Sequence, residues 1–358
     1  MKQRVVFVLA VLLPIQIGGI NLLSRFPNFV EKYYSFGLYP IISKIERFLL
    51  GWIPFSVGDV LYAFLIFMLL RWLYLRLKNR FRFPKKWILE ALAVLSVLYF
   101  SFHFLWGFNY YRLPLHQSLG IETEYTTAEL ADYTDKLIKK ANLLHFQITE
   151  NDSVKVEFPY EKDEILKMTI AGYQQIQWEF PALDYAQKSL KPSLFSIPLS
   201  YMGFNGYLNP FTNEAQVNTQ LPKFKIPSTA SHEVGHQMGF AKENEANFIA
   251  CLVSMQHPDI YFRYAGTTFA LRYCLNTLYF KNRKMAEKLG EKIHYGIKLN
   301  YREMEQFWEA YENPMEIFFK VFYGSYLKVN NQPEGMRSYT YVVGLLVNYA
   351  KMKNPSTD

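Results

Sequence analysis

Two histidines and a glutamate stand close together in the stretch "SHEVGHQMGFAKENEAN", residues 231–247. His232 and His236 are four residues apart, so on a helix their imidazoles lie on one face and can bind one ion. Glu233 is rotated enough to miss that ion and still reach a water beside it. The H-E-x-x-H spacing is typical of zinc sites. We therefore predict a metal centre in which His232 and His236 are ligands and Glu233 is the general base.

A third ligand is expected from the acidic run that follows. Residues 243–247, "ENEAN", offer Glu243 and Glu245. Helical positions two apart point about 200° apart, so only one of them can face the ion. Two histidines and one carboxylate suit several divalent metals, of which zinc is the expected one. The spacing by itself leaves both glutamates open.

The elements that must position these residues have recognisable boundaries. Pro227, Ser228 and Thr229 provide helix-start chemistry before the histidines, and Gly239 provides a stop. Residues 193–222 before them alternate short apolar runs with Gly, Asn and Pro, which indicates strands and turns. Asn209 and Asn213 are interpreted as turn residues, although a strand here could also bind an extended peptide beside the site.

Most of the remaining chain reads as helix. Thr126 with Glu129 three residues later forms a capping-box pattern before an apolar repeat of helical spacing. Cys251 and Cys274 are too few for a disulfide framework, and we expect two buried free thiols. The prediction is a mainly α fold with one small β-sheet.

Three stretches are apolar enough to cross a membrane: residues 5–23, 53–75 and 91–111. The second is the weakest, because Asp59 and Arg71 interrupt it. The third ends in aromatic residues that suit the membrane interface. Residues 1–20 also resemble a secretory signal, but without a small-x-small cleavage site we favour an uncleaved anchor. We therefore divide the chain into a membrane domain, 1–111, and a second domain, 112–358.

The charge of the chain is unevenly distributed. The net charge is +8, but residues 1–111 hold 13 Lys/Arg against 4 Asp/Glu, whereas residues 112–358 hold 26 against 27. The basic excess therefore indicates membrane topology and no nucleic-acid partner. Residues 71–86 carry seven basic side chains, and short basic loops stay in the cytoplasm. Residues 112–358 are then expected outside it. The apolar, aromatic residues 24–52 are expected as helices on the membrane surface, without catalytic residues.

The motif resembles that of gluzincin metallopeptidases, which carry H-E-x-x-H on one helix and a pattern like E-x-x-A-D on the next. In "ENEAN" an Asn replaces the final Asp. With the three spans and "FNGYLNPFTNEAQVN", residues 204–218, most of the chain resembles the DUF3810 family of bacterial membrane proteins. The resemblance implies a zincin-like domain with one Zn²⁺, Glu243 as third ligand with Glu245 as its rival, and Asn247 as the hydrogen-bond partner of His232.

These observations predict a zinc metallopeptidase anchored in the bacterial cytoplasmic membrane that cuts a peptide or protein substrate beside the bilayer. The alternative is a zincin-fold sensor or scaffold without turnover, which Asn247 would permit. Tyr326, Arg337 and Tyr339 are candidate donors to a developing oxyanion, and the resemblance favours the two tyrosines; packing roles are the other explanation. Three spans without paired repeats make a poor transporter.

Overall fold

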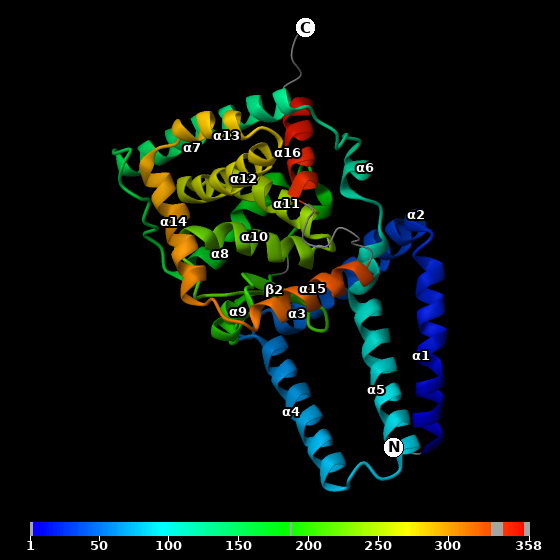
Figure 1. The fold of residues 1–358 in the computed structure, drawn as a ribbon. Helices are drawn as coiled ribbons and strands as arrows, with labels where there is room; N and C mark the ends of the chain where they lie inside the picture. Colours follow the sequence, from blue (N-terminus) through cyan, green and yellow to red (C-terminus); the bar gives the residue numbers. More distant parts are fainter. Residues whose placement is uncertain (1–2, 187, 331–338, 354–358) are drawn as a thin grey trace.

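The chain forms three long apolar helices attached at one end to a mostly helical body, as Figure 1 shows. This computed structural model describes residues 3–186, 188–330 and 339–353. Helices dominate, and one three-stranded sheet lies within the body. The predicted fold class, mainly α with a small β-sheet, is therefore confirmed.

The three long helices are α1 (Gln3–Leu23), α4 (Val57–Lys78) and α5 (Pro84–Leu105), each long and apolar enough to cross a membrane. Helix α1 packs along α5. The start of α1 and the α4–α5 connection lie at one end of these helices, opposite the body (Figure 1). Helix α4 begins later than the predicted residue 53 because the Ser56 hydroxyl caps it, accepting from the Asp59 N–H at 2.9 Å.

The third span is shifted relative to the predicted 91–111. Helix α5 begins with Pro84 at its first position and ends at Leu105. The chain then turns into the body through η2 (Gly107–Tyr111). We expected the aromatic side chains of this stretch to face the membrane interface, but they pack on protein. Trp106, Tyr110 and Tyr111 are buried with Tyr34 and Tyr39 in a second, smaller core.

Residues 27–50 are helical, as expected, but they also contact the body. They form α2 (Pro27–Phe29), the π-helical η1 (Val30–Leu38) and α3 (Tyr39–Leu50). One face of α3 exposes apolar side chains: Ile41, Ile45, Phe48 and Leu49. The opposite face buries Tyr39, Ser43 and Arg47 against the body. An exposed apolar face opposite a buried one suits a helix lying at the bilayer surface.

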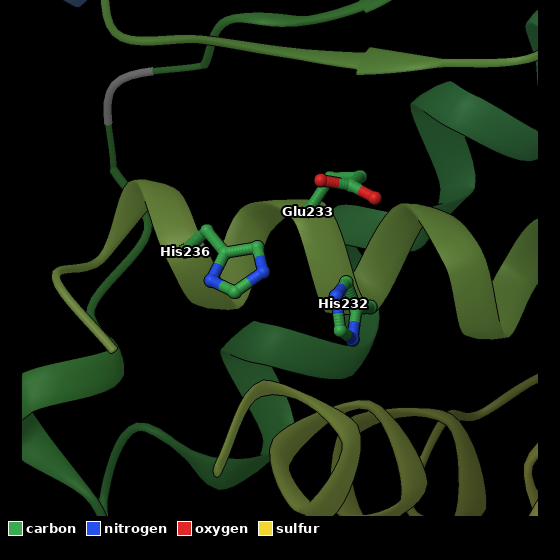
Figure 2. A group of neighbouring side chains, drawn as sticks. All are labelled: His232, Glu233 and His236. Atoms are coloured by element: carbon green, nitrogen blue, oxygen red, sulfur yellow. The ribbon is translucent and has the colours of Figure 1, made fainter. Parts of the chain in front are cut away.

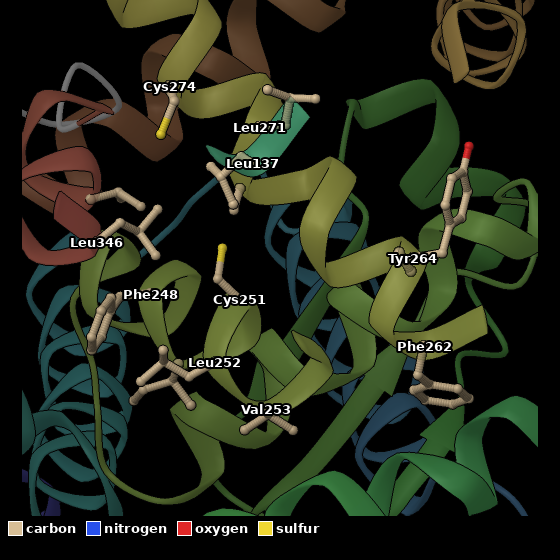
Figure 3. Packing of buried hydrophobic residues seen from close by; sticks show 14 of the residues in the cluster. Leu137, Phe248, Cys251, Leu252, Val253, Phe262, Tyr264, Leu271, Cys274 and Leu346 are labelled. Atoms are coloured by element: carbon tan, nitrogen blue, oxygen red, sulfur yellow. The ribbon is translucent and has the colours of Figure 1, made fainter. Parts of the chain in front are cut away.

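The body has one main hydrophobic core, in which α7, α10, α11, α12 and α16 pack together. Cys251 and Cys274 are both free and buried in it, as predicted (Figure 3). The predicted capping box is also confirmed, since Thr126 and Glu129 begin α7 with reciprocal bonds. The helical elements of the body are α6 (Leu115–Leu119), α7 (Thr127–Thr149), α8 (Lys162–Ile176), η3 (Pro181–Leu183), α9 (Ser196–Met202), η4 (Lys223–Lys225), α10 (Ile226–Gln237), α11 (Glu243–Met255), α12 (Ile260–Lys281), α13 (Arg283–Glu291), α14 (Tyr295–Ala310), α15 (Glu316–Val329) and α16 (Tyr339–Lys353).

The sheet has the order β1 (Leu190–Pro192), β3 (Glu214–Val217), β2 (Gly206–Asn209). Strand β3 pairs in parallel with β1 and antiparallel with β2, with Gly206 opposite Val217. Both β2 and β3 pack on helix α10. Asn213 lies in the turn between β2 and β3 with φ +48°, as favoured, whereas Asn209 is the last residue of β2 and is paired with Glu214. The Asn209 side-chain oxygen accepts from the Phe211 N–H at 2.9 Å at the start of that turn.

The sheet is bonded directly to the start of α4. The buried Glu214 carboxylate accepts from the Val57 N–H at 3.1 Å, from the Gly58 N–H and from the Lys191 ammonium. Asp59 accepts from the Leu194 N–H at 2.7 Å and from the Tyr207 hydroxyl. Carboxylates suit the positive end of a helix. The acidic residue that interrupts the second span therefore joins that span to the body.

Candidate metal centre

Helix α10 places the two histidines on one face, as their spacing predicts. Their ring centroids are 4.6 Å apart, and both side chains are largely buried. Each of His232, Glu233 and His236 offers a possible ligand atom, and these atoms lie within 4.8 Å of one another. Figure 2 shows Glu233 pointing from α10 toward the strand beside it, whereas His232 points to the other side of the helix.

A tight turn brings the next helix back onto α10. Gly239 has φ +88°, which only glycine adopts readily, and α11 starts at Glu243. The two helices approach closely where Gly235 meets Ala246: a Cβ added to Gly235 would lie 3.6 Å from the Ala246 Cα. Two small residues at the crossing therefore let the first turn of α11 reach the histidines.

Of the two acidic candidates, Glu243 is the one that faces the histidines. Its carboxylate oxygens lie 3.2 Å from His232 Nε2 and 3.5 Å from His236 Nε2. The Glu245 carboxylate is fully buried on another side of α11, where it accepts from the Leu115 N–H at 2.8 Å. The structure thus brings Glu243 to the site and gives Glu245 a bond at the start of α6.

The outer nitrogen of His236 has a defined partner. Its Nδ1 lies 2.8 Å from the Phe240 carbonyl oxygen. Because a carbonyl only accepts, Nδ1 must carry the proton, and in the neutral imidazole Nε2 is then a free lone pair directed at the site. Carbonyl bonds of this kind orient metal-binding histidines. The Gly239 turn therefore also supplies the bond that orients His236.

The expected partner of His232 is missing. Among the residues that the structure describes, His232 Nδ1 is buried without a hydrogen-bond partner. Asn247 lies one helical turn after Glu243 and is half-buried, but its amide does not bond His232. The positioning role that the resemblance implied for Asn247 is not formed in this geometry.

Glu233 is buried and packs closely against strand β2. A Cβ added to Gly206 would lie 2.8 Å from a Glu233 carboxylate oxygen and 2.5 Å from the Gln216 carbonyl oxygen, so only glycine fits there. The other carboxylate oxygen of Glu233 is buried without a partner in the described part of the chain. Burial, reinforced by the charge of Glu243 and opposed by His236, raises the pKa of Glu233 to about 8.

The neighbouring groups form an ion pair in the metal-free site. Burial opposes a charged imidazole, but the carboxylates of Glu243 and Glu233 outweigh it and raise the pKa of His236 to about 9. Burial lowers the pKa of His232. Burial would also raise the pKa of Glu243, yet His236 and the bonds from both imidazoles hold that pKa well below its usual range. A negative carboxylate thus lies beside two ring nitrogens.

Two residues of the predicted membrane domain, together with Arg112 at the start of the second domain, hold the C-terminal end of α10. The Trp106 indole N–H donates to the His236 carbonyl at 2.9 Å, and the Tyr39 hydroxyl donates to the Gln237 carbonyl at 2.7 Å. Arg112, paired with buried Glu31 at 2.8 Å, donates to the Gly239 carbonyl at 3.1 Å. Carbonyls at a helix end need such partners. The aromatic run from residue 106 was the available sequence signal, whereas nothing in residues 24–52 indicated Tyr39.

The predicted oxyanion donors cannot be assigned a place in the site. Tyr326 lies on α15 and Tyr339 at the start of α16, but their side chains are outside the described residues. Arg337 falls between residues 330 and 339 and is outside them as well.

Comparison with known proteins identifies the family. The model of the DUF3810 family, described as a protein of unknown function, matches residues 34–347. The chain therefore belongs to the DUF3810 family. No curated protein and no solved structure matches it. The match begins before α3 and extends into α16, so it includes the elements that hold the end of α10.

Proposed function

We propose that this member of the DUF3810 family is a membrane-anchored zinc metallopeptidase, with His232, His236 and Glu243 as the metal ligands. The observation that carries the proposal is the convergence of both Nε2 atoms on the Glu243 carboxylate, at 3.2 and 3.5 Å, with Glu233 beside them on the same helix. Glu233 lies close enough to be considered as a ligand, but it contacts β2, whereas Glu243 contacts both imidazoles.

The donor set fits one divalent ion. Two imidazoles and a carboxylate that leave a fourth position open are the ligands of catalytic zinc sites. The Nδ1 proton of His236 directs a lone pair at the site, and the unpartnered oxygen of Glu233 leaves one buried acceptor for an incoming water. When bound, zinc would supply a Lewis acid that activates water and polarises a peptide carbonyl.

Glu233 would act as the general base and then as the general acid. Its buried carboxylate would accept a proton from the attacking water and deliver that proton to the leaving nitrogen. In the metal-free site the pKa of Glu233 is about 8, and a nearby cation favours the ionised carboxylate, which is the form a base requires. Because Gly206 has no side chain, the Glu233 carboxylate can lie directly against strand β2.

Strand β2 would bind an extended peptide substrate along its edge. It is one of the two edge strands in the order β1-β3-β2, and its first residue lies against Glu233. A peptide added along such an edge gains main-chain hydrogen bonds without depending on its side chains. The oxyanion donor is assigned to Tyr326 or Tyr339 as part of the same proposal.

The location of the protein is proposed from charge and geometry together. The start of α1 and the basic α4–α5 connection lie at the same end of the three helices, opposite the metal centre (Figure 1). With that basic end in the cytoplasm, the body faces the extracytoplasmic side of the bacterial membrane. The partners are then the lipid bilayer and a peptide or protein substrate close to its surface.

The decisive experiment compares the purified full chain with a Glu233→Gln variant. We expect one zinc per chain in both proteins by elemental analysis, and loss of peptide hydrolysis in the variant only. Removing a general base typically costs about 10²- to 10⁴-fold in rate. Metal-free protein, or a variant as active as the original chain, would refute the assignment.

A second candidate is a zinc-binding sensor or scaffold without turnover. It is supported by Asn247 in place of the gluzincin Asp and by the unpartnered Nδ1 of His232, since a histidine without that bond is a less basic and less fixed ligand. Stoichiometric zinc with no hydrolysis across a broad peptide library would favour this candidate over the peptidase.

A further inference from the structure

A cavity in the body lies apart from the candidate metal centre, since His232, Glu233 and His236 do not line it. It has a volume of about 490 Å³ and lies between α3, the end of η1 and the segment around η3. Met238, the residue after α10, lines the cavity on the side of that helix. The residues that give it chemical character are Ser35, Tyr39, Ser43, Lys44, Arg47 and Asp184.

A buried guanidinium lines this cavity without a carboxylate partner. Arg47 is 2% exposed, and its three nearest partners are neutral: the Ser43 carbonyl at 3.2 Å, the Ser43 hydroxyl at 3.4 Å and the Met238 sulfur at 3.2 Å. Within the described ranges no carboxylate lies in ion-pairing distance of it. Buried charges are normally paired, so this geometry predicts an anionic ligand.

Other groups in the cavity agree with an anion. Ser35 is 3% exposed, and its hydroxyl has no hydrogen-bond partner in the described part of the chain. This hydroxyl can therefore donate a hydrogen bond to a ligand. Lys44 adds a second positive charge at the exposed rim. Asp184 is the acidic group of the lining, but it is exposed and therefore screened by solvent. Burial raises the pKa of the neighbouring Glu46 to about 8 against the opposing effect of Arg47, which favours its neutral form near pH 7.

The position of the cavity indicates where the anion comes from. Ile41, Ile45 and Phe48 on the neighbouring face of α3 are all more than half exposed, as expected for a face in contact with lipid. Lys44 lies between that face and the cavity, where a long basic side chain reaches the level of lipid phosphates. Figure 1 places α3 at the end of α4 and α5 that meets the body.

We propose that this cavity binds the phosphate headgroup of an anionic phospholipid, with Arg47, Ser35 and Lys44 as its donors. Arg47 and Ser35 provide charge-assisted and neutral hydrogen bonds to phosphate oxygens, and the acyl chains remain in the bilayer beside Ile41 and Phe48. Tyr39 lines the same cavity while its hydroxyl holds the Gln237 carbonyl, so an occupied cavity also stabilises the end of α10. The site is independent of whether the metal centre turns over a substrate.

The test measures lipid binding by the full chain in a neutral detergent, using native mass spectrometry with phosphatidylglycerol and phosphatidylcholine as probes. We expect phosphatidylglycerol to bind more tightly, and Arg47→Gln to weaken it about tenfold, the value of one lost charge-assisted hydrogen bond. Ser35→Ala and Lys44→Gln should each weaken it less, and they test the site even if Arg47→Gln folds poorly.

The matched control is Lys32→Gln, which removes an exposed positive charge from η1 outside the cavity and should leave binding unchanged. Equal binding of the two lipids, or full binding by all three cavity variants, would overturn the proposal. Displacement of phosphatidylglycerol by an equimolar amount of inorganic phosphate would overturn the lipid assignment. None of these measurements uses peptide hydrolysis, so their outcome is separate from that of the peptidase proposal.

Discussion

At the scale of single residues, the two glutamates of "ENEAN" have different surroundings although they are two positions apart. Glu243 contacts both imidazoles, whereas Glu245 is fully buried and accepts from the Leu115 N–H. A helix turns by about 100° per residue, so the side that faces α10 can hold only one of them. Substituting Glu243 should therefore affect zinc binding, whereas substituting Glu245 should affect stability.

We predict that Glu243→Gln weakens zinc binding by more than the roughly 10- to 100-fold typical of losing an outer-shell partner, because a charged ligand is removed. Glu245→Gln is the matched control: it should keep zinc and lose stability, because it perturbs a buried acceptor. Zinc affinity by chelator competition and thermal unfolding would measure the two effects. Loss of zinc in Glu245→Gln with zinc retained in Glu243→Gln would show that Glu245, and not Glu243, is the third ligand.

Protonation of His236 should control metal affinity. In the metal-free protein its pKa is raised to about 9, mainly by Glu243 against the opposing effect of burial, so near neutral pH its Nε2 carries a proton. A metal must displace that proton, so binding is weaker at low pH and strengthens as pH rises toward about 9. If one proton is released when zinc binds, we expect the zinc affinity to increase about tenfold per pH unit in that range. Zinc titrations at several pH values would test this, and a flat profile would contradict it.

At the scale of elements, the crossing of α10 and α11 sets the distance between the histidines and Glu243. Gly235 and Ala246 form that crossing, and Ala246 is fully buried. A Cβ on Gly235 would meet Ala246 at ordinary contact distances of 3.6 and 3.7 Å. The crossing thus has room for one methyl group and no more.

We predict that Ala246→Leu destabilises the fold by about 1–3 kcal/mol through overpacking and lowers zinc affinity, because it pushes the first turn of α11 away from α10. Gly235→Ala is the contrasting variant and should retain zinc, with a stability gain of up to about 1 kcal/mol from better helix propensity. Denaturant unfolding and metal content would be measured for both. Zinc loss in Gly235→Ala with none in Ala246→Leu would show that the crossing does not position Glu243.

At the scale of the whole molecule, the membrane helices and the body are not separate units. Tyr39, Trp106 and Arg112 hold the carbonyls at and just after the end of α10, and Glu214 with Asp59 binds the sheet to the start of α4. Strand β3, which carries Glu214, packs on α10, so both attachments reach the helix that carries the histidines. A division at residue 111 therefore separates Tyr39 and Trp106 from the carbonyls at the end of α10 to which they donate.

We predict that Glu214→Gln costs about 3–5 kcal/mol, because it leaves Lys191 buried without a counter-charge and weakens the bonds to the start of α4. Glu161→Gln is the control: that side chain is 83% exposed in its pair with Lys223, and such pairs contribute about 1 kcal/mol or less. Thermal unfolding of the full chain in detergent would compare them, and equal small losses would show that this junction contributes little.

Sequence reasoning succeeded where the chemistry depends on local spacing. His232, Glu233 and His236 lie on one helix because residues four apart share a face in any helix, and the Gly239 stop follows from a glycine's freedom at positive φ. The three apolar helices follow from length and hydropathy. These features need no knowledge of the rest of the fold.

Contacts between distant segments were decided only by tertiary structure. The choice of Glu243 depends on how α11 packs on α10, and the bonds from Tyr39 and Trp106 join residues far apart in the chain. The aromatic run from residue 106 is equally suited to lipid or to protein, and it is buried because Tyr34 and Tyr39 pack with it in the second core. The sequence by itself therefore determined which groups could hold a metal, because local periodicity fixes helix faces. The fold decided which carboxylate meets them and that Tyr39 and Trp106 hold the end of their helix, because packing partners carry no local signal.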